Sequence, residues 1–220
     1  MTKKRVGVLI SGRGSNLGAL IEACRAPSYP AKIVLVISNV PAAQGLLRAE
    51  AALIPTLVIN HKDFPTRESF DEALDKALAE AGVEILCNAG FMRLHTEGFV
   101  RHWWDRHLNI HPSLLPAFKG LQTHERVLQA GAKISGCTVH FVRPEMDEGP
   151  IVAQAAVPVL PDDTPDSLAA RVLEAEHRLY PLALGLVASG KIRVEGERVV
   201  GMTQVRAQTP LFSPLPEEPF

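Results

Sequence analysis

The chain has few of the features that mark several common classes of protein. Its 220 residues include three cysteines, Cys24, Cys87 and Cys137. An odd number at such wide separations argues against a disulfide framework and against CxxC-type zinc binding. No apolar run approaches the length of about 18 residues that a transmembrane helix needs. The run Val6–Ile10 is also too short for a signal peptide. We therefore expect a protein of the reducing cytoplasm that has no membrane partner.

An excess of charge of one sign is missing as well. Lysine and arginine number 23 against 24 aspartates and glutamates, which argues against a strongly basic nucleic-acid binder. The 16 glycines and 17 prolines are too few for a disordered or collagen-like chain. Hydrophobic residues make up 46%, enough for a packed core. At roughly 150 residues per domain we expect residues 1–220 to form one domain.

The first two-thirds of the chain show a regular alternation of short apolar runs with helical patterns. The apolar runs predict strands at residues 5–11, 32–38, 56–59, 85–89 and 108–110. The helical patterns cover residues 16–26 and 44–52 and a stretch that begins after Thr66. Buried strands that alternate with helices indicate βαβ units. The expected fold class is α/β, with an open, mostly parallel twisted sheet and helices on both faces.

The last third of the chain has a different pattern. A short helix is predicted at 124–130, two strands at 135–142 and 151–159, and a long helix after Thr164. Residues 191–195 and 198–201 read as a hairpin. We therefore expect antiparallel additions toward the C-terminus, followed by an extended proline-rich tail at 206–220.

A glycine-rich turn, Ser11–Asn16, lies between the first predicted strand and the first helix. Backbone N–H groups at a helix N-terminus, together with the helix dipole, form a site for anions. The dinucleotide pattern GxGxxG is not met, because its sixth position is Leu17. A phosphate monoester therefore fits better than NAD. The alternative is a tight strand-to-helix turn that binds nothing.

Five of the eight histidines lie between residues 95 and 124. They match no zinc-binding pattern, so we expect no metal site. We expect His102 at the end of a helix and His107 in a surface turn.

Asn109 and His111 stand out because they are two positions apart on a predicted strand and so share one face. Open parallel sheets bind ligands beyond the carboxyl ends of their strands. An amide and an imidazole placed there can polarise a carbonyl group and move a proton. Asp147, from the turn between the two later strands, could pair with His111. The alternative is a strand end whose polar residues cap a loop, and a turn whose Asp, Gly and Pro need no other role.

Several longer motifs carry a resemblance to a known family. The segments ISGRGSNL, AGFMRL, LNIHPSLLPAFKG, VHFVRPEMDEGPI and EHRLYP, spread over residues 5–205, resemble the phosphoribosylglycinamide formyltransferase family of folate-dependent formyltransferases. The resemblance implies a Rossmann-like formyltransferase fold. It also implies that the chain transfers a formyl group from 10-formyltetrahydrofolate to the primary amine of glycinamide ribonucleotide in purine biosynthesis. Residues 1–105 would form the nucleotide-binding half, and residues 106–205 the catalytic and folate-binding half.

The resemblance also implies roles for individual residues. The catalytic set would be Asn109, His111 and Asp147. The nucleotide would contact Gly14, Ser15 and Asn16 with its phosphate and Glu176 with its ribose. The expected folate contacts are Arg67, Met92, Arg93, Leu94, His95 and Asn109, together with the backbone of Arg143, Pro144, Glu145, Met146 and Asp147. Three positions depart from the family pattern: Arg13, Gln122 and Leu173.

Three alternatives are compatible with parts of this pattern. Formyltetrahydrofolate deformylases share the Asn-His-Asp set but let water attack, and they carry an added N-terminal domain. Methionyl-tRNA formyltransferases share SLLP but add a C-terminal domain and a basic surface. A nucleotide-binding module without catalytic activity is the third. An assay for formyl transfer with and without glycinamide ribonucleotide would separate them.

Overall fold

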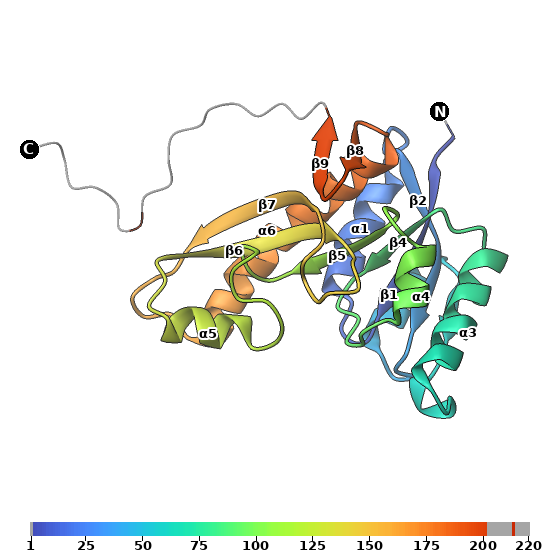
Figure 1. Ribbon diagram of the computed structural model, residues 1–220, viewed down its shortest axis with the longest axis horizontal. Helices are drawn as coiled ribbons and strands as arrows, with labels where there is room; N and C mark the ends of the chain where they lie inside the picture. The colour runs from blue at the N-terminus through green and yellow to red at the C-terminus, as the bar shows by residue number, and fades with distance from the viewer. Residues whose placement is uncertain (1, 202–212, 214–220) are drawn as a thin grey trace, which may run out of the picture.

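The computed structural model describes residues 2–201 and Ser213, so the predicted tail at 206–220 falls almost wholly outside the described residues (Figure 1). One seven-stranded sheet has the order β3-β2-β1-β4-β5-β6-β7, and a separate two-stranded sheet pairs β8 with β9. The strands are β1 (Lys4–Ile10), β2 (Ala31–Ser38), β3 (Thr56–Val58), β4 (Ile85–Asn88), β5 (His107–His111), β6 (Ile134–Phe141), β7 (Ile151–Pro158), β8 (Ile192–Glu195) and β9 (Arg198–Gly201).

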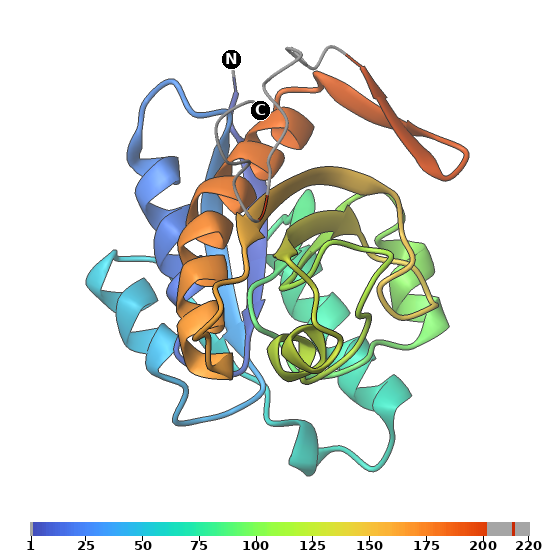
Figure 2. The same ribbon diagram turned by 90° about the vertical axis from the view of Figure 1, so that its left-hand side faces the viewer.

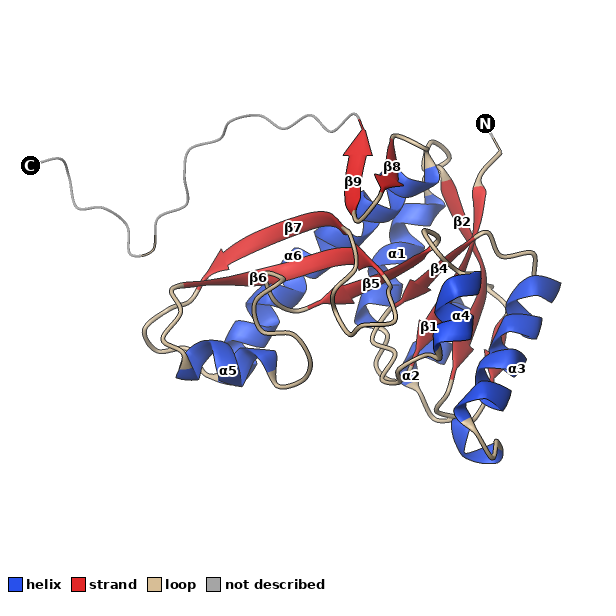
Figure 3. Ribbon diagram, viewed as in Figure 1, coloured by secondary structure: helices blue, strands red, loops and turns tan. Residues whose placement is uncertain are grey.

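The helices alternate with the strands along most of the chain (Figure 3). They are α1 (Ser15–Arg25), α2 (Gln44–Ala51), α3 (Arg67–Glu80), α4 (Glu97–His102), α5 (Thr123–Gln129) and α6 (Pro165–Ala188), and a 3₁₀ turn lies at His61–Asp63. Strands β1 to β5 pair in parallel, whereas β5 pairs with β6 and β6 with β7 in antiparallel fashion. The predicted fold class, with its antiparallel additions toward the C-terminus, is confirmed.

Both faces of the sheet are covered because the side chains of a strand alternate between them. In β1, Val6, Val8 and Ile10 join the core formed with α1, α2, α5 and α6, while Leu9 points to the other core, beneath α3 and α4. Figure 2 shows α1 and α6 side by side on one face, where they pack against each other. None of the helices within residues 2–201 has both the length and the apolar character needed to cross a membrane.

The α4–β5 region agrees with the prediction at one histidine and differs from it at another. The sequence indicated a helix end at His102 but no bounds for the helix, since so short an element as α4 has no periodic apolar pattern. His102 is its last residue, as expected, but His107 does not lie in a surface turn. His107 is fully buried at the start of β5, where its Nε2 donates to Asn88 Oδ1 over 3.0 Å. The prediction was wrong because β5 begins one residue earlier than its apolar run suggests.

The sheet order places the functional segments together. The chain leaves β1 toward β2 on one side and returns to β4 on the other, so the order reverses between β1 and β4. Open α/β sheets bind ligands in the crevice at such a reversal, beyond the carboxyl ends of the strands. The loops that follow β1, β4 and β5 all begin at this edge.

Candidate active site

The turn after β1 presents the N-terminus of α1 toward the crevice. Gly14 adopts a left-handed conformation with φ of 67°, and a Cβ at this position would lie 2.6 Å from the Cα of Gly45. Only glycine meets both requirements. No side chain of the described residues caps α1, so the N–H groups of its first turn, which begins at Ser15, are available to an anion.

Asn16 and Glu176 form a buried pair beside this turn. Asn16 Nδ2 donates to Glu176 Oε2 over 2.7 Å, and both side chains are buried. Burial raises the pKa of Glu176, and the Asn16 hydrogen bond opposes part of that rise. Asn16 Oδ1 has no hydrogen-bond partner among the described residues. The residues expected at the phosphate and at the ribose therefore lie side by side.

Asn109 and His111 point from β5 into the same space. The antiparallel register places Asn109 opposite His140 of β6, and Asn109 Nδ2 donates to His140 Nε2 over 3.2 Å. His140 Nδ1 donates to the Phe141 carbonyl over 2.9 Å. His140 is thus a neutral imidazole, in accord with its burial, which lowers its pKa; the charge of Asp147 acts in the opposite direction. An amide NH₂ has two hydrogens, so Asn109 keeps one for a ligand.

His111 is held from two sides. Its Nε2 donates to the Phe118 carbonyl over 2.9 Å, and its Nδ1 lies 3.4 Å from Asp147 Oδ2. The same carboxylate oxygen accepts from the Gly120 N–H over 2.8 Å. Because the Phe118 carbonyl fixes a proton on Nε2, Nδ1 is the ring atom of His111 that gains or loses one. That atom faces Asp147.

His140 is the residue of this group that sequence reasoning missed. It stands 3.7 Å from Asp147 Oδ1 as well as against Asn109. Its position within the VHFV segment was visible, but its link to Asn109 depends on the register of β5 against β6. An apolar-run pattern does not specify that register.

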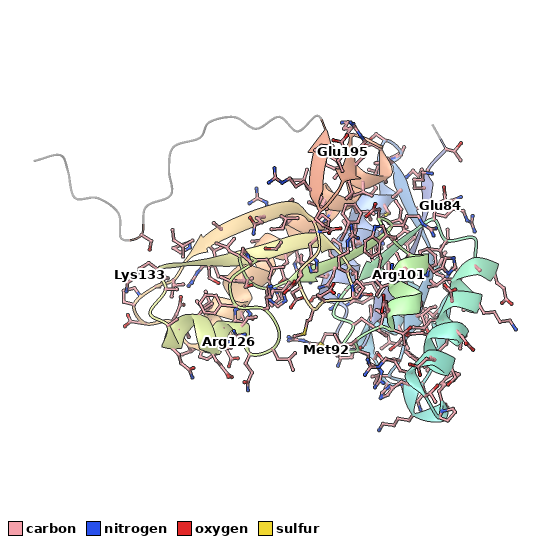
Figure 4. All side chains as sticks on the ribbon, viewed as in Figure 1. Glu84, Met92, Arg101, Arg126, Lys133 and Glu195 are labelled. Atoms are coloured by element: carbon pink, nitrogen blue, oxygen red, sulfur yellow. The ribbon has the colours of Figure 1, made fainter. Side chains whose placement is uncertain are left out.

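The stretch after β4 forms another wall. The Met92 N–H donates to the Ser11 hydroxyl over 2.8 Å, which ties this stretch to the turn after β1. Asp71 of α3, 3% exposed, accepts from the Thr96 N–H over 2.6 Å and lies 3.4 Å from His95 Nδ1. The His95 ring stacks between Phe91 and Phe99. Figure 4 shows Met92 between the part of the molecule that holds α3 and α4 and the part that holds α5.

One cavity of about 630 Å³ joins these walls. The predicted site residues that line it are Asn16, Met92, Arg93, Leu94, His95, Asn109, His111, Arg143, Pro144, Met146, Asp147 and Glu176. Gly14, Ser15, Arg67 and Glu145 are not among its lining residues. Of the three positions that depart from the family pattern, Gln122 lines the cavity, while Arg13 and Leu173 do not.

The whole arrangement can be compared with known proteins. The family model described as "Formyl transferase" matches residues 4–184. The chain belongs to the formyl transferase family. The match includes every residue of the site described above.

Individual members of the formyl transferase family match most of this chain, but the share of their own length that it covers differs. The chain is 54% identical over 203 residues to the trifunctional purine biosynthetic protein adenosine-3 of Bos taurus, covering 92% of this chain but about a fifth of that protein. It is 42% identical over 192 residues to the phosphoribosylglycinamide formyltransferase of Haemophilus influenzae, covering 87% of this chain and 91% of that one. Glycinamide ribonucleotide transformylase 1 from Symbiobacterium toebii superimposes with a TM-score of 0.89 at 46% identity, covering 91% and 95% of the two chains.

Proposed function

We propose that this protein transfers a formyl group from 10-formyltetrahydrofolate to the primary amine of glycinamide ribonucleotide, as one step of purine biosynthesis. The observation that carries the proposal is the meeting of Asn109, His111 and Asp147 in one cavity. That cavity extends from the Asn16–Glu176 pair to the stretch Met92–His95. The names of the relatives that this chain matches over nearly their full length support the same activity.

The two ends of the cavity suit the two substrates. At one end, the first turn of α1 offers N–H groups to a phosphate, and Glu176 offers a carboxyl group to ribose hydroxyls. At the other end, Met92–His95 provides apolar side chains beside backbone polar groups. A pterin ring needs that combination. Arg67 and Glu145 do not line the cavity. We therefore expect them to contact only a part of the folate that extends beyond it.

The chemistry follows from the three side chains between these ends. The substrate amine forms a bond to the formyl carbon, and negative charge develops on the formyl oxygen. The free amide hydrogen of Asn109 and a protonated His111 Nδ1 stabilise that charge. The carboxylate of Asp147 lies 3.4 Å from His111 Nδ1, on the side of the ring opposite the Nε2 hydrogen bond to Phe118. The bond to the folate nitrogen N10 then breaks, and the proton lost by the amine passes to N10. Holding both substrates in one cavity supplies proximity.

We place the reaction in the cytoplasm, with small molecules as its partners and 10-formyltetrahydrofolate as co-substrate. Cys24, Cys87 and Cys137 are all free thiols, which fits a reducing compartment. The near balance of acidic and basic residues supports small-molecule partners over nucleic acid.

The test is a formyl-transfer assay on the purified protein with 10-formyltetrahydrofolate. We expect tetrahydrofolate to form only when glycinamide ribonucleotide is present, with the formylated nucleotide as the second product. Release of formate without the nucleotide would identify a hydrolase instead. Binding of both substrates without turnover would identify a module that has lost catalysis.

A further inference from the structure

The side chain of Arg143 has no part in the chemistry above, although it lies at the start of the loop that carries Asp147. This loop, residues 142–150, joins β6 to β7 and borders the cavity. The Arg143 side chain is only 4% exposed. A buried guanidinium is costly unless its charge is paired and its hydrogens are bonded. Its partners therefore stabilise a buried charge at the start of this loop.

Three side chains surround the Arg143 guanidinium. Its Nη2 lies 2.7 Å from Asp105 Oδ1, and its Nε lies 3.0 Å from Glu197 Oε2. Its central carbon lies 3.8 Å from the ring centroid of Trp104, a cation–π contact. Trp104 and Asp105 come from the turn between α4 and β5, and Glu197 comes from the turn between β8 and β9. Arg143 thus joins three segments that are distant in sequence.

The contact with Glu197 is unusual because it reaches outside the matched family region. That region ends at residue 184, and the hairpin of β8 and β9 forms its own two-stranded sheet. Glu197 is 61% exposed, yet its carboxylate is directed to the buried Arg143. Within the described residues, Arg143 is the ion-pair partner through which this hairpin reaches the Asp147 loop.

The stem of Arg143 also contacts the far end of the loop. Arg143 Cγ lies 3.1 Å from the point where a Cβ of Gly149 would stand, and that point is only 1.7 Å from the Phe141 carbonyl oxygen. The two ends of the loop are therefore packed against each other. Asp147 between them has φ of 59°, a left-handed conformation that a non-glycine residue keeps only when its surroundings hold it.

We propose that Arg143 is a positioning residue, whose side chain, held by Trp104, Asp105 and Glu197, fixes the loop that presents Asp147 to His111. Through Glu197, the turn between β8 and β9 thereby helps to position Asp147. The expected change in kcat and KM rests on the proposed function, whereas the expected loosening of the loop does not. The positive charge of Arg143 also acts on His140, whose pKa is lowered first by burial and in smaller part by this charge.

The contacts of Arg143 with Trp104, Asp105 and Glu197 form a clamp on the loop, and Arg143→Gln removes the charge at its centre. Glu197→Gln weakens the same clamp at an exposed side chain, so the core stays intact. We expect both variants to lower kcat and to raise KM for 10-formyltetrahydrofolate, with KM for the nucleotide unchanged. The fall in kcat for Arg143→Gln should be on the order of 10- to 100-fold, because misplacement of a reacting group by about 1 Å can cost about 100-fold. The His140 ring, followed by NMR, should titrate at higher pH in Arg143→Gln.

Glu195→Gln is the matched control, because Glu195 lies on the same hairpin and pairs with Arg193 rather than with the loop. A second readout needs no substrate: amide hydrogen exchange at residues 145–149 in the free protein. It should be faster in Arg143→Gln and Glu197→Gln than in the wild type, and unchanged in Glu195→Gln. Arg143→Lys should recover part of the wild-type kcat, since lysine keeps the charge but cannot bond both carboxylates in the same fork.

Two results would overturn the role of Arg143. One is unchanged loop exchange in Arg143→Gln or, should that variant not fold, in Glu197→Gln. The other is a fall in melting temperature with normal kcat and KM per folded molecule. If the wild-type protein transfers no formyl group, the proposed function fails, and the exchange experiment still decides whether Arg143 fixes the loop.

Discussion

Asp147 is the residue of the site with the most constraints on its position. Its Oδ2 accepts from the Gly120 N–H and faces His111, while its Oδ1 faces His140 at 3.7 Å. Its backbone has a positive φ of 59°. Asp and Asn adopt this conformation more readily than other non-glycine residues. Aspartate at this position therefore meets two requirements. Its backbone tolerates the positive φ, and its side chain places a negative charge beside His111.

Asp147→Asn separates these two requirements. Asparagine tolerates the same φ and keeps an oxygen for the Gly120 N–H, so the variant should fold, but it loses the negative charge. We expect kcat to fall on the order of 10² to 10⁴-fold, the usual effect of removing a group that assists proton transfer. Steady-state kinetics and the affinity for a folate analogue check this, and the analogue should still bind.

His111→Ala and Asn109→Ala should cost similar factors, and combined losses should not add, because the groups act as a unit. Glu148→Gln is the control, since Glu148 is the exposed neighbour and pairs with Lys119. Near wild-type turnover in a folded Asp147→Asn protein would contradict the role given to Asp147. The same result for His111→Ala would contradict the mechanism.

At the scale of elements, the first turn of α1 decides where the nucleotide phosphate lies. Replacing Gly14 is a poor test, because any side chain there meets Gly45 and adopts a strained φ. Ser15 is the first residue of α1 and is partly exposed. An aspartate at this position interacts favourably with the helix dipole, by about 0.3–1 kcal/mol, but repels a phosphate.

We therefore expect Ser15→Asp to keep its stability and to raise KM for glycinamide ribonucleotide by at least about tenfold. Even 1.4 kcal/mol of repulsion corresponds to about that factor, and two like charges about 4 Å apart near a protein surface exceed it. KM for 10-formyltetrahydrofolate should not change. Ser15→Asn, which is neutral and of similar size, serves as the comparison in the same assay. An unchanged nucleotide KM in Ser15→Asp would place the phosphate elsewhere.

The elements themselves were largely readable from the sequence, and their contacts were not. The strands β1, β2 and β4 are continuous apolar runs because both faces of a central parallel strand are buried. The turn at Gly14 was recognisable from its glycines. What the sequence could not provide was register and order: β6 lies beside β5 and sets His140 against Asn109. The clamp on Arg143 depends on three turns whose proximity is a property of the assembled fold.

At the scale of the whole molecule, the core holds histidines in their neutral form. Burial lowers the pKa of His107 well below its ordinary value of 6.5, and the nearby His95 and His140 lower it further. The pKa of His140 is also lowered, chiefly by burial. The unfolded chain, in contrast, exposes both imidazoles to water. Protonation below the ordinary pKa is therefore more favourable in the unfolded state than in the folded one.

This difference predicts how stability depends on pH. For a group whose folded pKa is lowered, the stability it contributes is complete above the unfolded pKa, about 6.5, and is lost as pH falls through the folded pKa. Each such histidine contributes a slope of up to about 1.4 kcal/mol per pH unit in the free energy of unfolding below that point. Urea unfolding of the wild type at several pH values between 7.5 and 5 should show this acid-side loss.

His107→Leu assigns the effect to a residue. The variant loses the hydrogen bond to Asn88 and should be less stable at pH 7.5, but its stability should fall less steeply than that of the wild type as pH decreases. The slope is the informative quantity, because the absolute stability also reflects the changed packing. Leu108→Ala is the matched control, since Leu108 is the buried neighbour of His107 on β5 and has no ionisable group, so this variant should lose stability without a change in slope. An unchanged slope in His107→Leu would mean that His107 takes up a proton equally well in the folded and unfolded chains. The buried imidazole at the start of β5 would then have no influence on the acid stability of the fold.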